Sequence, residues 1–115
     1  MEMDMDMVDC AMACAECSIA CKNCANHAVR EGLDCVNASN ECSDMCRICA
    51  DMCVNPNFSM EELESVCRKC VELCERSIEK CRDHNNEHCK LCRNTCFKCI
   101  FMCRKFLSMR RKAIA

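Results

Sequence analysis

The chain has 115 residues, 19 of them cysteine, and a net charge of −2. This length is enough for one domain around a single core. Acidic and basic residues are interspersed, and the only basic cluster is the short "MRRKAIA" end, so we expect no nucleic-acid partner. One Gly, one Pro and no Trp or Tyr argue against β-hairpins, and no apolar run approaches the roughly 18 residues that span a membrane.

The first predicted helix has cysteines three and four residues apart, the spacing by which apolar side chains reach the seam of a helical bundle. Its start, "MEMDMDM", continues this spacing through Met3 and Met7. These methionines therefore either fill the core or offer soft thioether ligands to a metal.

Three more helices of the same kind follow, separated by segments with turn chemistry. "ANHAVREGLD" holds Gly32, "VNPNFSMEEL" holds Pro56, and "RDHNNEH" is a polar, asparagine-rich turn. Ser59 stands three residues before Glu62, which predicts a capping box at the start of the third helix. In chain order, the four helices carry Cys10, Cys14, Cys17, Cys21 and Cys24; Cys35, Cys42, Cys46, Cys49 and Cys53; Cys67, Cys70, Cys74 and Cys81; and Cys89, Cys92, Cys96, Cys99 and Cys103.

Ser39 and Ser77 fill the two gaps in this spacing, so every seam position of the four helices is cysteine or serine. Helices of this length with short connections predict an all-α fold, an antiparallel up-down-up-down four-helix bundle with a cysteine-lined core, formed by residues 1–115 as one domain. Because cysteine buries less apolar area than leucine, a seam made of it indicates a purpose other than packing.

Disulfides are not expected for these cysteines. Their number is odd, and neighbours on one helix have Cβ atoms about 5–6 Å apart, against about 3.5–4.5 Å in a disulfide. The acidic, alternating start does not resemble a signal peptide. We therefore expect free thiols and a cytoplasmic location.

A seam of thiols predicts binding of soft metal ions. The compact cysteine runs of iron–sulfur proteins are absent, and the thiols do not form isolated quartets of the kind typical of structural zinc sites. Cu(I) accepts two or three thiolates, so pairs four residues apart can each hold an ion and pairs three apart connect successive sites. The pattern favours many Cu(I) ions per chain. The alternative is a metallothionein-like Zn(II) or Cd(II) buffer, although such chains are rich in C-x-C, which is missing here.

The stretches "CAECSIACKNC", "ECSDMCRIC" and above all "HCKLCRNTCFKCIFMCR" (residues 88–104) resemble the bacterial four-helix-bundle copper storage proteins. The resemblance covers nearly the whole chain. It implies a bundle whose core cysteines bind many Cu(I) ions, a homotetramer, and the family's cytosolic rather than exported type. A copper chaperone or an efflux protein is then a candidate partner.

The two ends of the predicted bundle differ. His27, His84 and His88 fall in the first and third connections, which share one end. They are either surface loop residues or the place where copper enters. At the other end, Met60, Leu63 and Phe106 extend the seam and predict an apolar plug.

The outward faces also differ. Asp44, Arg47, Asp51, Arg68, Glu72 and Glu75 make those of the second and third helices charged. The outward residues of the first and fourth include Met12, Ile19, Phe97 and Phe101, which predict a self-association surface. No enzymatic role is expected, because the adjacent His88 and Cys89 point in different directions on a helix and no other group orients them.

Overall fold

The cysteine spacing corresponds to four α-helices in the structure, a computed structural model that describes the backbone of residues 5–55 and 57–114 and the side chains of residues 6–55 and 57–110. The helices are α1 (Met5–Glu31), α2 (Val36–Cys53), α3 (Met60–Cys81) and α4 (Glu87–Ile114). The prediction of one helix for each set of cysteines is confirmed except for Cys35, which lies directly before α2 as its N-cap residue. Met3 and Pro56 lie outside the described residues.

Local chemistry sets the helix ends. Gly32 has a φ of 68°, the left-handed conformation that glycine adopts freely, and Leu33 N–H donates to the Ala28 carbonyl across it at 3.0 Å, which ends α1. At the start of α3, Glu62 N–H donates to Ser59 Oγ at 3.1 Å, and Ser59 N–H donates to the Glu62 carboxylate at 3.3 Å. This is the predicted capping box.

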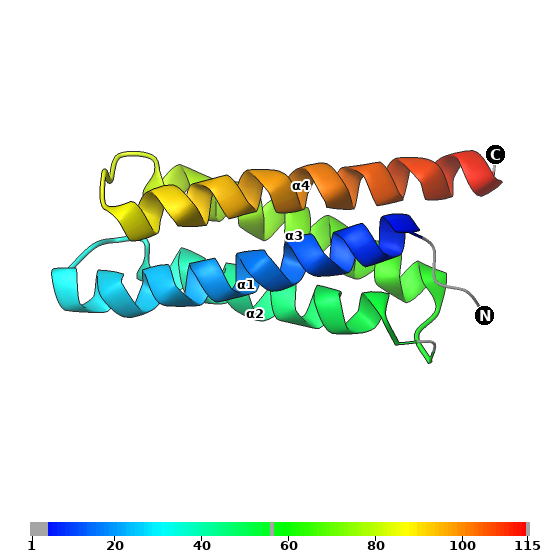
Figure 1. Ribbon diagram of the computed structural model, residues 1–115, viewed down its shortest axis with the longest axis horizontal. Helices are drawn as coiled ribbons and strands as arrows, with labels where there is room; N and C mark the ends of the chain where they lie inside the picture. The colour runs from blue at the N-terminus through cyan, green and yellow to red at the C-terminus, as the bar shows by residue number, and fades with distance from the viewer. Residues whose placement is uncertain (1–4, 56, 115) are drawn as a thin grey trace.

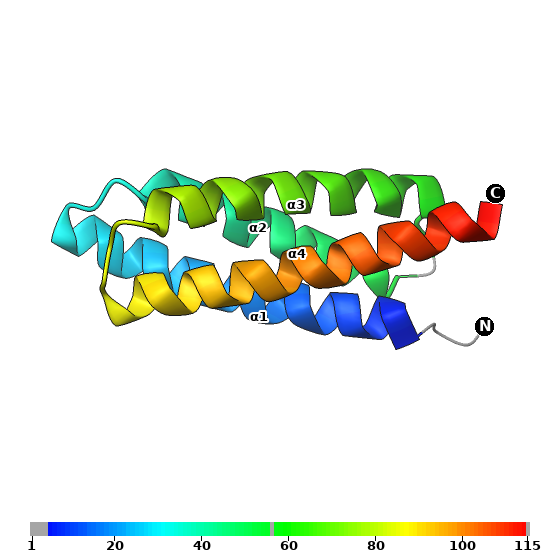
Figure 2. The same cartoon turned by 90° about the horizontal axis from the view of Figure 1, so that it is seen from above.

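The helices lie lengthwise side by side in a bundle with extents of 46 × 23 × 19 Å (Figure 1 and, from above, Figure 2). Cys10 of α1 lies against Cys103 near the end of α4, whereas Cys24, later in α1, lies against Cys89 at the start of α4. These two helices therefore run in opposite directions. The α1–α2 and α3–α4 connections lie at one end of the bundle, as an up-down-up-down order requires (Figure 1).

The core of the bundle is made of sulfur. All 19 cysteines are free thiols, and none of their side chains is more than 2% exposed. Ser39 and Ser77 are fully buried among them, which confirms that they occupy the two remaining seam positions. Small alanines such as Ala13 and Ala25 are also buried and let the helices approach closely.

The end of the bundle away from the histidines is closed by apolar side chains. Leu63 and Phe106 are 2% and 4% exposed, and Met7 packs against the core, as the sequence predicts. The prediction is wrong for Met60, which is 38% exposed. Met60 is the first residue of α3, and because helical side chains tilt toward the N-terminus, its side chain extends past the end of the core.

Outside the core, the surface divides as predicted. Asp44, Arg47 and Glu72 of α2 and α3 are exposed and charged, whereas the outer side of α1 and α4 carries exposed apolar residues. The exposed fractions are 59% for Met12, 73% for Ile19, 58% for Phe97 and 64% for Phe101. None of the described helices is long and apolar enough to cross a lipid bilayer.

Candidate metal centre

The sulfur atoms form a column of contacts that runs along the bundle. Sγ–Sγ distances within it reach from 3.2 Å to 4.0 Å. Most of these contacts join different helices: Cys10–Cys103 (3.6 Å), Cys14–Cys99 (3.5 Å), Cys17–Cys96 (3.6 Å), Cys21–Cys92 (3.2 Å), Cys42–Cys74 (3.5 Å), Cys46–Cys70 (3.5 Å) and Cys49–Cys67 (3.6 Å).

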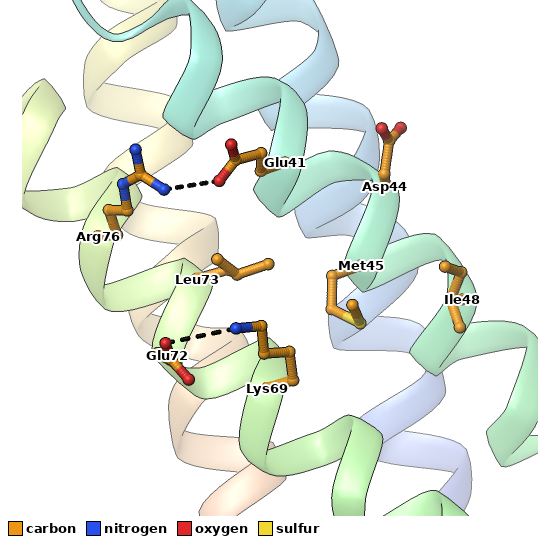
Figure 3. Close-up of a pocket in the computed structure, with 8 residues that line it drawn as sticks. All are labelled: Glu41, Asp44, Met45, Ile48, Lys69, Glu72, Leu73 and Arg76. Carbon is orange, nitrogen blue, oxygen red and sulfur yellow. Dashed lines mark hydrogen bonds and ion pairs between the residues drawn. The ribbon is translucent and has the colours of Figure 1, made fainter.

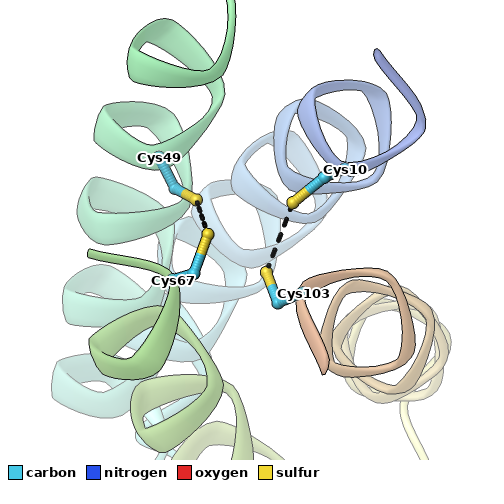
Figure 4. Close-up of side chains that lie close together, drawn as sticks. All are labelled: Cys10, Cys49, Cys67 and Cys103. Carbon is cyan, nitrogen blue, oxygen red and sulfur yellow. Dashed lines mark hydrogen bonds between the residues drawn. The ribbon is translucent and has the colours of Figure 1, made fainter. Parts of the chain in front are cut away.

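Within the column, groups of four thiols have all their sulfurs within 4.8 Å of one another. Figure 4 shows one such group, in which Cys10, Cys49, Cys67 and Cys103 point toward a common centre from α1, α2, α3 and α4. A second group replaces Cys10 and Cys67 by the next thiols of α1 and α3 and keeps the other two. Neighbouring groups therefore share sulfur atoms.

Further groups continue the column toward its middle and its histidine end. They are Cys17, Cys46, Cys74 and Cys99; Cys17, Cys42, Cys74 and Cys96; and Cys24, Cys35, Cys81 and Cys89. The first two take one thiol from every helix, and the third takes Cys35, the N-cap residue directly before α2, with one thiol each from α1, α3 and α4. An ion bound by all four thiols of one of these groups would therefore connect the four parts of the bundle.

The spacing of the sulfurs suits a metal ion. Metal–thiolate bonds of about 2.3 Å, as in zinc sites, place tetrahedral sulfurs roughly 3.8 Å apart. The observed contacts of 3.2–4.0 Å lie around this value, so little side-chain movement is needed. Thiolates are soft ligands, and their natural partners are Cu(I), Zn(II) and iron–sulfur clusters.

The thiols also modulate one another's ionisation. The Cys21 thiol, whose sulfur lies 3.2 Å away, and then the thiols of Cys24, Cys81 and Cys96 lower the pKa of the Cys92 thiol. Conversely, contact with Cys17 and then Cys42 raises the pKa of Cys74. At the histidine end, burial raises the pKa of Cys89 to about 11. A bound cation would replace these thiol protons and would balance the negative charge of the thiolates.

His88 is the histidine that reaches the sulfurs. Its side chain is 9% exposed, and its Nε2–H donates to a carboxylate oxygen of Glu31 at 2.9 Å. Because Nε2 carries the proton, Nδ1 presents its lone pair, at 3.4 Å from Cys24 Sγ and 3.5 Å from Cys89 Sγ. A carboxylate behind an imidazole is the usual way to orient a metal-binding histidine.

The other two histidines play different parts. The His27 ring stacks on that of His88, with centroids 5.0 Å apart and planes 12° from parallel. His84 Nε2 instead contacts Asp34 Oδ1 at 2.8 Å, and this hydrogen bond lowers the pKa of Asp34. His27 therefore lies beside His88, the histidine that contacts the thiols, whereas the His84 side chain contacts Asp34 instead.

Two supporting residues were not identified from the sequence. Glu31, the last residue of α1, also accepts a hydrogen bond from Asn86 Nδ2 at 2.8 Å, so one carboxylate links both connections. Arg93 of α4 donates to the carbonyls of Cys81 and, at 2.9 Å, His84, which caps the end of α3. The signal in the sequence is weak, because charged residues next to helix ends are common.

A hollow on the outside of α2 and α3 offers no comparable site (Figure 3). Of its carboxylates, Glu41 pairs with Arg76 at 2.7 Å and Glu72 pairs with Lys69 at 3.4 Å, while Asp44 lies 3.7 Å from Lys22. These acidic groups are matched by cations, so the metal ligands of the described residues are those in the core.

The profile of the family described as Csp, copper storage protein, matches residues 2–108. Among solved structures, the chain is similar to one described as copper loading to a cytosolic copper storage protein from Streptomyces lividans, with five coppers. The TM-score is 0.82 at 24% identity, over 90% of this chain and 93% of that one, and this likeness concerns the fold. None of the curated proteins compared with the chain matches it significantly.

Proposed function

Because the chain belongs to the copper storage protein family, we propose that it stores many Cu(I) ions on the thiolates of its 19 core cysteines. The observation that carries this proposal is the series of four-thiol groups along the bundle, in which two pairs of neighbouring groups share sulfurs. The family is one of storage proteins rather than enzymes, and we assign residues 1–115 to one storage domain without a catalytic residue.

Binding is an exchange of protons for metal. Each thiol that binds Cu(I) loses its proton, so loading releases protons and becomes more favourable as pH rises toward the raised pKa of thiols such as Cys89. Repulsion between neighbouring thiolates is offset by the Cu(I) ions between them. A thiolate that belongs to two groups can bridge two ions, so the column holds more metal than separate quartets would.

A Zn(II) or Cd(II) buffer is the competing function, since four thiols suit those ions as well. It differs in capacity. Zinc generally needs four protein ligands for each structural site, so 19 thiols would hold about four ions. Shared sulfurs allow Cu(I), which binds two or three thiolates, to reach on the order of one ion per thiol.

Titration of the fully reduced protein under anaerobic conditions tests the function. We expect on the order of one Cu(I) per thiol to remain bound after gel filtration, and Cu(I) to displace Zn(II) in competition with chelators of known affinity. Binding of only one to three Cu(I) per chain, or retention of Zn(II) against Cu(I), would contradict copper storage.

We place the uptake of copper at the end that carries His27, His84 and His88. Support comes from the Nδ1 atom of His88, which lies against Cys24 and Cys89 while its ring is held by Glu31. A neutral imidazole in this position can pass an ion to the first thiols. The opposite end is closed by Leu63 and Phe106.

Replacing all three histidines with alanine is expected to slow loading by about tenfold, the lower end of the effect of losing a metal-orienting group, and to leave capacity intact. His88→Ala alone should account for most of the change, because only His88 contacts the sulfurs. His84→Ala is the matched control, since His84 contacts Asp34 instead. Stopped-flow uptake from a Cu(I) chelator measures the rates, and wild-type rates in the triple variant would overturn this role.

The remaining features of the function are proposals of the same kind. A cytoplasmic location suits a core of free thiols, which a reducing compartment preserves. A homotetramer that associates through Met12, Ile19, Phe97 and Phe101 would cover the exposed apolar side of α1 and α4. A copper chaperone or an efflux protein would deliver or remove the ions.

A further inference from the structure

The sulfur column is interrupted at one level. Ser39 of α2 and Ser77 of α3 are fully buried and take the place of thiols there. Both hydroxyls approach the same sulfur, that of Cys92, at 3.9 Å for Ser39 and 3.4 Å for Ser77, so the two serines lie at the same level from neighbouring helices. A neutral hydroxyl is a hard ligand and a poor partner for Cu(I).

The serines divide the thiols into two sets. The four thiols at the histidine end, Cys24, Cys35, Cys81 and Cys89, form the group that we call the vestibule, next to His88. The groups described above on the other side of the serines, which we call the store, form two pairs that each share two thiols, and contacts such as Cys14–Cys99 and Cys46–Cys70, both at 3.5 Å, join the pairs. None of these groups shares a thiol with the vestibule. Half of the cross-section between the two sets therefore carries no thiol.

Cys92 connects the two sets. On the store side, its sulfur lies 3.2 Å from that of Cys21, which in turn lies 3.6 Å from that of Cys96. On the vestibule side, the Ser39 hydroxyl lies 3.9 Å from the sulfurs of both Cys92 and Cys81, and the Cys81 sulfur lies 4.0 Å from that of Cys24. The other two helices offer Ser39 and Ser77 at this level, so among the described residues the thiols found there are Cys21 of α1 and Cys92 of α4.

We propose that Cys92 is the transfer ligand through which Cu(I) passes between the vestibule and the store. Because Ser39 and Ser77 offer no thiolate at this level, this transfer is the slowest step in loading the store. The inference rests on the proposed copper function. Cu(I) held by the thiolates of Cys24 and Cys81 first exchanges Cys81 for Cys92, and then exchanges Cys24 for Cys21, whose sulfur lies 3.2 Å from that of Cys92.

Each exchange forms one copper–sulfur bond and breaks one. The proton that the incoming thiol loses is taken up by the thiolate that the ion leaves, and Cu(I) is neither oxidised nor reduced. The charge along the column therefore does not change during transfer. We therefore expect Cu(I) to enter and leave the vestibule quickly and to exchange with the store more slowly, because that exchange passes through Cys92.

Cys92→Ser and Cys96→Ser provide a matched pair for the test. Both residues lie on α4, four residues apart, and both are fully buried. The sulfur of Cys96, however, lies 3.6 Å from that of Cys17 and 3.8 Å from that of Cys42, both in the store, and 3.6 Å from that of Cys21. Each variant loses one thiol in the same chemical way.

Anaerobic loading of both variants and the wild type from a Cu(I) chelator should be followed by thiolate–copper absorbance. In Cys92→Ser we expect a fast phase restricted to the few ions of the vestibule and a store phase slowed by at least about tenfold. Cys96→Ser removes one store ligand, so we expect it to lower the capacity slightly and to slow the store phase much less than Cys92→Ser does. Adding Ser39→Cys and Ser77→Cys to Cys92→Ser should restore the store phase, because it opens a path on α2 and α3.

Equal store rates in the two single variants, or no rescue by the added thiols, would overturn the transfer role of Cys92. Thermal melts of the reduced, metal-free variants check that each one folds. Failure of the copper function itself would appear separately, as low total copper in the wild type, whereas failure of this inference leaves wild-type capacity unchanged.

Discussion

Loading the reduced protein with Cu(I) is expected to raise its thermal unfolding temperature by about 16 °C or more. One site at a thousandfold excess of free metal over its dissociation constant stabilises the folded state by about 4 kcal/mol. For a domain near this size, each kcal/mol raises the melting temperature by about 4 °C. Several occupied sites would raise it further, less whatever copper the thiols of the unfolded chain bind.

The large effect follows from the position of the sites. The group Cys10, Cys49, Cys67 and Cys103 joins all four helices, so an ion bound there must be released before any helix separates. The metal-free core offers less in return, because cysteine side chains bury less apolar area than leucines would. Bound copper therefore adds stability to a folded bundle whose cysteine core is less stabilising than a leucine core would be.

Anaerobic melts of the metal-free and loaded protein, followed by circular dichroism, measure this shift. Serine at positions 10, 49, 67 and 103 together provides the control, since the variant keeps the remaining thiols but should gain less from copper. An unchanged melting temperature of the wild type on loading would mean that the ions do not bridge the helices and would contradict the proposed site.

The sequence predicts the core of this protein because one physical rule governs it. Helical periodicity places residues three and four apart on one side, so cysteine spacing identifies both the seam and its two serines, Ser39 and Ser77, which are buried as expected. The ends of the helices follow from equally local chemistry, such as the Ser59 capping box.

Periodicity does not predict how the ends of the bundle are arranged. His84 and His88 stand in the same short segment, yet only His88 contacts sulfur. His88 lies in the first turn of α4, four residues before Cys92, and this spacing is a signal that could have separated them. The pairing of His88 with Glu31 depends on how two distant connections meet, which no local pattern contains. Met60 shows the same limit at the other end, where the seam spacing continues but the core does not.

The apolar side of α1 and α4 leads to the second large effect. The contacts Cys10–Cys103 and Cys14–Cys99 bring Met12 to the level of Phe101 on the neighbouring helix. The ion pair of Glu16 with Lys98, at 3.1 Å, crosses between the two helices nearby. Apolar side chains from both helices thus gather on one outer surface, where a second copy of the chain would bury them.

Phe97→Glu combined with Phe101→Glu is expected to dissociate the proposed oligomer. The two rings are 58% and 64% exposed in the single chain, and burying a phenylalanine stabilises by about 1.5–3 kcal/mol. Their loss should weaken association by at least about a hundredfold for each chain, since about 1.4 kcal/mol corresponds to a factor of ten. Buried glutamates would add a desolvation cost. Sedimentation equilibrium or light scattering measures the mass.

Ile48→Glu combined with Phe58→Glu is the matched control, because both residues are 44% exposed and lie on α2 and the α2–α3 connection, away from this surface. It adds the same charge and should leave the mass unchanged. Copper capacity should stay at the wild-type value in both double variants, because the thiols lie inside each bundle and Phe97 and Phe101 point away from them. An oligomer that persists in Phe97→Glu/Phe101→Glu would place the association on another face, whereas loss of copper together with loss of the oligomer would mean that the store depends on contacts between chains.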